Sequence, residues 1–203
     1  MIFQDAVKLL GRGDESGAQQ KLEKALSIEP VHIRARETLF ALLLNTGRVS
    51  EAVEKLSEGL RLRPTSAPLA KLYARVLVDQ GDNDAAVAVL ERARPSAVAD
   101  PDYYALLAAL YRGVGKHAQA SQTYQQILQV RPGVAVWWMG LALSEDAMGS
   151  ATKALEAYQR AQRSGGLKPE VVQYVQSRIA ALIPSALGNT SRVVVDDNDG
   201  FAD

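Results

Sequence analysis

Two cations on one predicted helix face carry the clearest binding chemistry in this sequence. Lys71 and Arg75 are four residues apart, so both side chains emerge on the same side of a helix. With Arg112 they are suited to hold a carboxylate-bearing segment through charge-assisted hydrogen bonds. Met139 and Leu143, also four residues apart, are suited to form an adaptable apolar pocket beside the cations. These residue types indicate binding of a peptide rather than catalysis.

Residues for covalent or metal chemistry are scarce. The chain has no cysteine, which excludes disulfides, thiolate zinc sites and cysteine nucleophiles. His32 and His117 fall in turns of different repeats, far apart in the sequence, so we expect no metal site. The stretch "DDNDG" is similar to a calcium loop, but Val195 stands where the first ligand of the loop is needed. No glycine-rich phosphate loop occurs, and we therefore predict no cofactor and no enzyme activity.

Composition narrows the class of partner. Lys plus Arg and Asp plus Glu both total 23, so the formal net charge is zero. A general nucleic-acid binder needs a basic excess, and we therefore expect no nucleic-acid partner. No apolar run approaches the roughly 18 residues of a membrane span, so we expect no direct membrane insertion by this segment.

The elements that must position these residues follow from a fixed period in the sequence. Glycines recur at equal spacing, at Gly13, Gly47, Gly81, Gly115 and Gly149. Five residues after each glycine stands an alanine, at Ala18, Ala52, Ala86, Ala120 and Ala154. Pro30, Pro64 and Pro132 close three of the units, while Val98 and Gly166 take this place in the others. Fixed-period repeats of this length indicate stacked supersecondary units.

Each unit predicts a helix, a glycine turn, a second helix and a break. Glycine reaches the left-handed conformation that ends the first helix, and proline stops the second. We expect five helix pairs over residues 1–166, the first truncated at its start, and a capping helix over 167–183. Residues 184–203 lack periodicity and are predicted to form a flexible tail.

The pattern resembles the tetratricopeptide repeat, whose unit has the same length as the spacing of these glycines. The stretch "WWMGLALSEDAMGSATKALEAYQRA" carries most of the motif. The resemblance implies an all-α, right-handed superhelical solenoid of five helix pairs plus a C-terminal capping helix. It also implies a non-catalytic scaffold for protein–protein interaction that binds a partner segment in a concave groove.

The groove is predicted on the arc of each first helix that faces neither its partner helix nor the previous repeat. Its candidate residues are Arg34, Glu37, Lys71, Arg75, Asp102, Arg112, Met139, Leu143 and Asp146. The alternative is a solvated face with local ion pairs, such as Arg75 with Asp79. Leu106 stands where a carboxylate clamp needs asparagine, so chaperone-tail binding is not predicted.

The adjacent tryptophans Trp137 and Trp138 are predicted to be structural. On a helical wheel Trp138 faces its own partner helix and Trp137 faces the previous repeat. Glu145 departs from the apolar type expected on the same inner stripe, and we expect it to reach an arginine or water.

The groove positions of the first repeat are apolar: Phe3, Val7 and Leu10. An exposed apolar patch marks an interface, and we expect missing upstream sequence, a partner or a second copy of the chain to cover it.

A further resemblance concerns phrases outside the generic repeat. "VWWMG" and "KLYAR" are similar to the C-terminal region of MshN-type proteins, which assist assembly of MSHA pili, a kind of type IV pilus. This implies a periplasmic domain of a bacterial protein anchored in the inner membrane, with other pilus or secretion assembly proteins as partners. The alternative is a general cytosolic peptide-binding or co-chaperone module.

Overall fold

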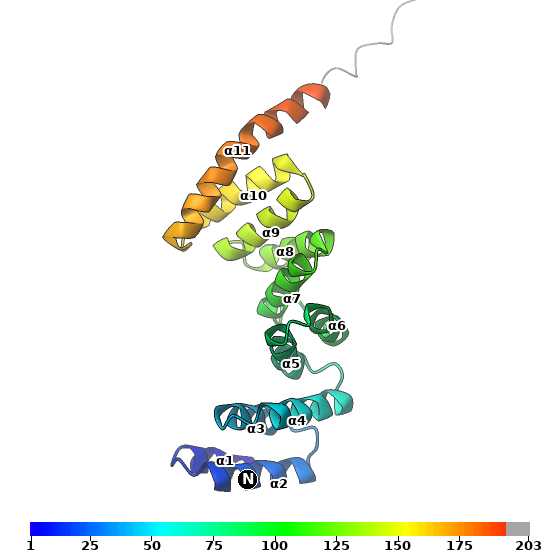
Figure 1. Ribbon diagram of the computed structural model, residues 1–203, viewed down its shortest axis with the longest axis vertical. Coiled ribbons are helices and arrows are strands. Elements are labelled where there is room, and N and C mark those ends of the chain that lie inside the picture. The colour runs from blue at the N-terminus through cyan, green and yellow to red at the C-terminus, as the bar shows by residue number, and fades with distance from the viewer. Residues whose placement is uncertain (194–203) are drawn as a thin grey trace, which may run out of the picture. The chain divides into compact units, whose positions relative to one another are not determined.

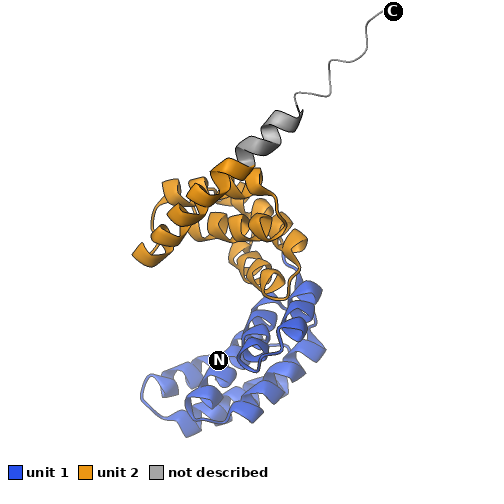
Figure 2. Cartoon of the chain, turned by 45° about the horizontal axis from the view of Figure 1, so that its top comes forward, with its two compact units in different colours: residues 1–95 blue, residues 96–203 orange. Residues whose placement is uncertain are grey.

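The protein is built from helices. A computed structural model describes the backbone of residues 1–193 and the side chains of residues 1–185. Eleven α-helices and no strand occur in this described part of the chain (Figure 1). They belong to two compact units, Met1–Pro95 and Ser96–Asp203 (Figure 2). The predicted all-α class is confirmed.

Unit 1 contains three helix pairs. The helices of each pair pack together, and α2 packs on α3 as α4 packs on α5. The pairs are α1 (Ile2–Leu10) with α2 (Glu15–Ile28), α3 (Ile33–Asn45) with α4 (Val49–Leu62), and α5 (Ala67–Asp79) with α6 (Asn83–Ala93).

Unit 2 contains two helix pairs and a final helix that packs on the second pair through α10. The pairs are α7 (Pro101–Gly113) with α8 (His117–Val130), and α9 (Ala135–Ala147) with α10 (Ala151–Ser164). The final helix is α11 (Pro169–Val193). The described residues thus contain the five predicted pairs followed by a helix in the capping position.

The periodic glycines end the first helix of every pair. All five have positive φ, between +74° and +82°, a region that side chains with a Cβ disfavour. The residue after each glycine then closes the turn, as where the Arg48 amide donates to the Leu43 carbonyl at 2.8 Å. The predicted glycine turn is confirmed.

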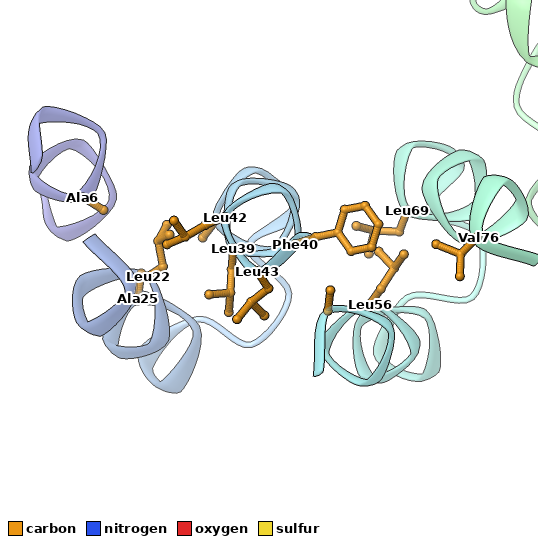
Figure 3. Close-up of a cluster of buried hydrophobic side chains, with 12 residues drawn as sticks. Ala6, Leu22, Ala25, Leu39, Phe40, Leu42, Leu43, Leu56, Leu69 and Val76 are labelled. Carbon is orange, nitrogen blue, oxygen red and sulfur yellow. The ribbon is translucent and has the colours of Figure 1, made fainter. Parts of the chain in front are cut away.

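Small and large apolar residues alternate along the second helices to form the core. The five periodic alanines are fully buried, which lets paired helices approach closely. In unit 1, Leu22 and Leu56 are buried in the same hydrophobic cluster (Figure 3). Phe40 points from α3 toward α5, where Leu69 lies, and this contact joins neighbouring pairs (Figure 3). The core therefore runs through consecutive repeats of unit 1 and no pair forms a core alone.

Helix α6 is shorter than the other second helices. It has 11 residues, whereas α2, α4, α8 and α10 have 14 each. Pro95 explains the difference, because a proline disfavours helical conformation in the residue before it. Arg94 accordingly has an extended ψ of 99°, and the helix ends at Ala93.

The last helix differs from the predicted capping helix and tail. We expected the helix to end at 183 and the tail to begin at Pro184, but α11 continues through Pro184 to Val193. Proline removes one helical hydrogen bond, the one to the carbonyl four residues earlier. That residue, Ala180, is exposed, so water can reach the interrupted turn. Residues 194–203 lie outside the described part of the structure.

Candidate partner-binding surface

The first helices of unit 1 place two of the predicted cations, Arg34 and Arg75, toward solvent. Arg34 on α3 and Arg75 on α5 are exposed, while Glu37 and Lys71 are half-buried. Helices α3 and α5 contact one another, so their free arcs are neighbours. Each arc also carries an aliphatic side chain near its end, Leu44 or Val78, both 37% exposed. The structure thus brings the unit 1 candidates together on one face.

The local ion pair that we set as the alternative does not form. Arg75 and Asp79 lie on the same helix, yet neither side chain makes an ion pair with any residue that the structure describes. Arg75 therefore presents a guanidinium whose five donors are open to a ligand.

The apolar patch of the first repeat is smaller than predicted. Phe3 and Leu10 are half-buried and pack against the core of unit 1, whereas Val7 is 46% exposed. The Phe3 ring lies 5.0 Å from the His32 ring and 5.2 Å from the Arg34 guanidinium, measured from its centroid. Packing against the next repeat accounts for the difference, because α1 is covered on the side that carries Phe3.

His32 has a structural role that its sequence context did not indicate. It is the N-cap of α3, and its Nδ1 accepts a hydrogen bond from the Ala35 amide at 3.2 Å. No cluster of three or more potential metal ligands occurs among the described residues.

Two of the charged candidates in unit 2 are engaged by residues of the same unit. Asp102 pairs with Arg131 at 3.3 Å, and both side chains are largely exposed. Arg112 is half-buried near Tyr124, and its Nε is buried without a hydrogen-bond partner among the described atoms. Burial raises the pKa of Tyr124 above its ordinary value, and the charge and hydrogen bond of Arg112 oppose the rise.

Asp146 is held by the final helix. Arg178 of α11 donates to its two carboxylate oxygens at 3.0 and 2.8 Å, and the Tyr158 hydroxyl donates at 3.2 Å. The hydrogen bond and charge of Asp146 raise the pKa of Arg178. Burial raises the pKa of Tyr158, and Tyr174 and Asp146 raise it further. Asp146 is therefore an anchor for α11, a role that sequence spacing could not reveal because Arg178 lies outside the repeats.

The remaining unit 2 candidates, Met139 and Leu143, are half-buried on α9. Beside them on the same helix, Val136 is 58% exposed. An apolar strip on this helix is thus partly accessible, as the adaptable pocket requires.

The tryptophans behave as structural residues. Trp137 is 5% exposed, and the Arg131 guanidinium lies 5.7 Å from its ring centroid. Trp138 is half-buried, and its Nε1 donates to the Pro132 carbonyl at 2.7 Å. Arg160 of the partner helix α10 lies 5.6 Å from the Trp138 ring centroid. Both indoles therefore hold elements of unit 2 together.

Two charged residues are buried in the repeats. Glu145 accepts a hydrogen bond from the Ser121 hydroxyl rather than from an arginine. Arg36 is only 2% exposed and donates to the Lys55 carbonyl at 2.6 Å and the Pro30 carbonyl at 2.8 Å. Its Nη1 also lies 3.4 Å from the Glu58 carboxylate. The sequence held one signal for Arg36, since Gly59 leaves room for it: a Cβ there would lie 2.1 Å from Arg36 Cδ.

Comparison with known families identifies the repeat. The tetratricopeptide repeat family matches residues 48–110 and, in a second match, residues 105–169. The chain belongs to the tetratricopeptide-repeat proteins, a class of typically non-catalytic scaffolds that bind protein partners.

Individual relatives are distant. The chain is 26% identical over 157 residues to the TPR repeat-containing protein YpiA of Bacillus subtilis (strain 168). The match covers 77% of this chain and 37% of YpiA, so the chain spans little more than a third of that relative.

Solved structures share the fold. A MamA crystal structure matches with a TM-score of 0.65 and 22% identity, covering 80% of this chain and 89% of MamA. A tetratricopeptide repeat protein from Parabacteroides merdae ATCC 43184 matches with a TM-score of 0.62 and 16% identity, covering 96% of this chain and 75% of that one. At these identities the likeness concerns the fold alone.

None of the described helices is both long and apolar enough to cross a membrane.

Proposed function

We propose that this chain is a scaffold that binds an extended, carboxylate-bearing segment of a partner protein along the free arcs of its first helices. The observation that carries the proposal is the open guanidinium of Arg75, exposed on α5 with no ion-pair partner in the described structure. Lys71 lies one turn away on the same helix, so a second positive charge stands near the carboxylate that Arg75 would hold.

The aliphatic side chains on the same arcs support a peptide rather than a small anion. Leu44 and Val78 are both accessible, so apolar side chains of the partner can be buried beside its carboxylates. In unit 2 we assign the same apolar role to Met139 and Leu143, while Asp102, Arg112 and Asp146 serve the architecture of that unit.

For the partner we propose a protein of a type IV, MSHA-like pilus or a related secretion machinery, with the repeats in the periplasm. The support is the likeness of "VWWMG" and "KLYAR" to MshN-type proteins. A general peptide-binding module in the cytosol is the competing function. The two differ in where the native protein fractionates and in whether the retained partner is a pilus assembly protein.

The test compares charge reversals in unit 1. Protein carrying Lys71→Glu with Arg75→Glu is used to retain partners from an envelope extract of the source cell. We expect loss of a pilus-assembly partner that the unaltered protein retains. The matched control is Lys21→Glu with Lys24→Glu, which makes the same charge change at exposed positions of α2. Equal retention by both variants would contradict binding along the arcs, and a retained set without pilus proteins would favour the cytosolic module.

A further inference from the structure

A cleft between second helices recurs along the chain. In unit 1 one cleft is lined by α2, α3 and α4, and another by α4, α5 and α6. In unit 2 a cleft is lined by α8, α9 and α10. Glu23, Ser57 and Gln125 line the three clefts and occupy one position of the repeat. The clefts are therefore versions of one site that differ in their side chains.

The fourth residue of the first helix fills two of these clefts. It is Arg36 in the α2–α4 cleft and Trp138 in the α8–α10 cleft. Each donates to the carbonyl of the proline that precedes its helix, Arg36 Nη2 to Pro30 at 2.8 Å and Trp138 Nε1 to Pro132 at 2.7 Å. A guanidinium and an indole thus make the same hydrogen bond in the same place.

The α4–α6 cleft lacks this side chain. Its fourth residue is Ala70, which has neither volume nor a donor to offer. The cleft measures about 370 Å³, against about 180 Å³ beside Arg36 and about 240 Å³ beside Trp138. The carbonyl of Pro64, which lines the cleft, accepts no hydrogen bond from any residue in the described structure. This cleft has room for a donor-bearing side chain that the described residues do not supply.

The charge of the α4–α6 cleft is also distinct. Arg61 and Arg92 line it, both are exposed, and neither guanidinium bonds another described residue. The equivalent residues of the α2–α4 cleft are Ser27 and Glu58. Among the described residues no acidic side chain lines the α4–α6 cleft. Its other walls are apolar or weakly polar: Ser57, Leu60, Pro64, Tyr73 and Val89. The combination favours an aromatic group accompanied by carboxylates.

This cleft lies on a different side of α5 from the arc that carries Lys71 and Arg75. Tyr73 stands two residues from each of them, which is about 200° around a helix. A ligand in the cleft therefore does not use the cations of the proposed groove.

We propose that the α4–α6 cleft binds an acidic peptide segment through a tryptophan side chain. The indole N–H donates to the Pro64 carbonyl, as Trp138 does to Pro132 in the α8–α10 cleft. Carboxylates two residues before and after the tryptophan lie on the same side of an extended peptide and meet Arg61 and Arg92. Tyr73 and Leu60 bury the ring.

The test measures fluorescence anisotropy of a fluorescein-labelled heptapeptide, Gly-Asp-Gly-Trp-Gly-Asp-Gly, titrated with the whole protein. We expect Arg61→Glu with Arg92→Glu to weaken binding at least about tenfold, because both contacts become repulsive. The matched control, Arg12→Glu with Arg63→Glu, makes the same charge change at exposed positions outside the cleft and should bind normally. Lys71→Glu with Arg75→Glu should also bind normally, which separates this site from the proposed groove.

Changes in the peptide test each contact. Replacing tryptophan by phenylalanine removes one neutral hydrogen bond and should weaken binding roughly two- to tenfold. Replacing both aspartates of the peptide by asparagine should weaken its binding to the unaltered protein. The same replacement should not weaken binding to the protein with Arg61→Glu and Arg92→Glu. Absence of binding, or equal binding by the Arg61→Glu, Arg92→Glu protein, would overturn the proposal.

Ala70→Trp provides a second variant, which fills the cleft from within. Ala93 occupies the same repeat position as Ala161, so the variant combines a tryptophan in the first helix with an alanine in the second, as unit 2 does. We expect Ala70→Trp to fold, by circular dichroism, and to lose the peptide. A folded Ala70→Trp protein that binds as tightly as the unaltered one contradicts the location of the site, and if this variant does not fold the arginine variants still decide.

Discussion

The free arcs of the first helices differ between the two units although the repeat places their residues at the same positions. In unit 1, Arg34 and Arg75 are exposed and make no ion pair with any described residue. In unit 2, Asp102 is paired with Arg131, and Asp146 is fixed by α11. A repeat position thus sets the direction in which a side chain points. Whether that side chain is available to a partner depends on residues elsewhere in the sequence.

The largest expected difference in the free energy of unfolding is between substitutions on the buried side of α9 and on its accessible strip. Trp137→Ala removes an almost fully buried ring, and we expect a loss of about 3–5 kcal/mol in the free energy of unfolding. Val136→Ala, one residue away and exposed, should change it by less than about 0.5 kcal/mol. Urea denaturation followed by circular dichroism measures both. Similar losses for the two variants would contradict the assignment of Trp137 to the interior.

A somewhat smaller difference in the free energy of unfolding is expected between a buried and an exposed arginine of α3. Arg36→Ala removes two hydrogen bonds to carbonyls and leaves space in the core, so we expect a loss of about 3 kcal/mol. Arg34→Ala removes only a contact with the Phe3 ring and should cost about 0.5–1 kcal/mol. Denaturant midpoints at constant slope give both values. Equal losses of stability for Arg36→Ala and Arg34→Ala would contradict a stabilising role for the buried hydrogen bonds of Arg36.

We expect the stability of unit 2 to fall at alkaline pH. Burial raises the pKa of Tyr124 and Tyr158 in the folded state above the ordinary value of about 10. The folded state therefore holds these protons more tightly than the unfolded chain, so this stability is present below about pH 10 and is lost as the pH rises above it. Urea midpoints at rising pH, followed by tryptophan fluorescence, report unit 2 because both tryptophans lie there. Tyr158→Phe should make the decline shallower, and an unchanged decline would contradict this origin.

The smallest expected difference in the free energy of unfolding is between two ion pairs within unit 2. Asp146→Asn weakens the two-oxygen contact with Arg178, and we expect a loss of about 1 kcal/mol with faster amide exchange in α11. Asp102→Asn breaks an exposed pair and should cost less than about 0.5 kcal/mol. Unchanged exchange in α11 after Asp146→Asn would show that the carboxylate does not anchor the helix.

Much of the fold could be predicted because periodic residues act locally. The glycine turns and the buried alanines depend on positions that recur once in every repeat, and all are where the sequence placed them. The site was harder to predict because availability depends on contacts between different repeats. Nothing near Asp146 in the sequence indicates Arg178, and nothing near Ser121 indicates Glu145.

The cleft beside Ala70 was also hard to predict from the sequence. Its side chains come from three helices, and its character depends on a large residue that is missing rather than on one that is present. Alanine carries no chemically active group, so its residue type does not indicate a site. Ala70 is significant because Arg36 and Trp138 fill the equivalent places and bond a proline carbonyl there.

The early end of α6 has a consequence for protein engineering. The third repeat keeps the same total length as its neighbours but divides it differently, because Pro95 stops its second helix before Arg94. A module exchanged at the glycine turns would therefore carry its own helix length with it, whatever its new neighbours. Pro95→Ala combined with Val98→Pro would move the stop to the place it has in the repeats that end in Pro30, Pro64 and Pro132, and would convert an irregular module into a standard one.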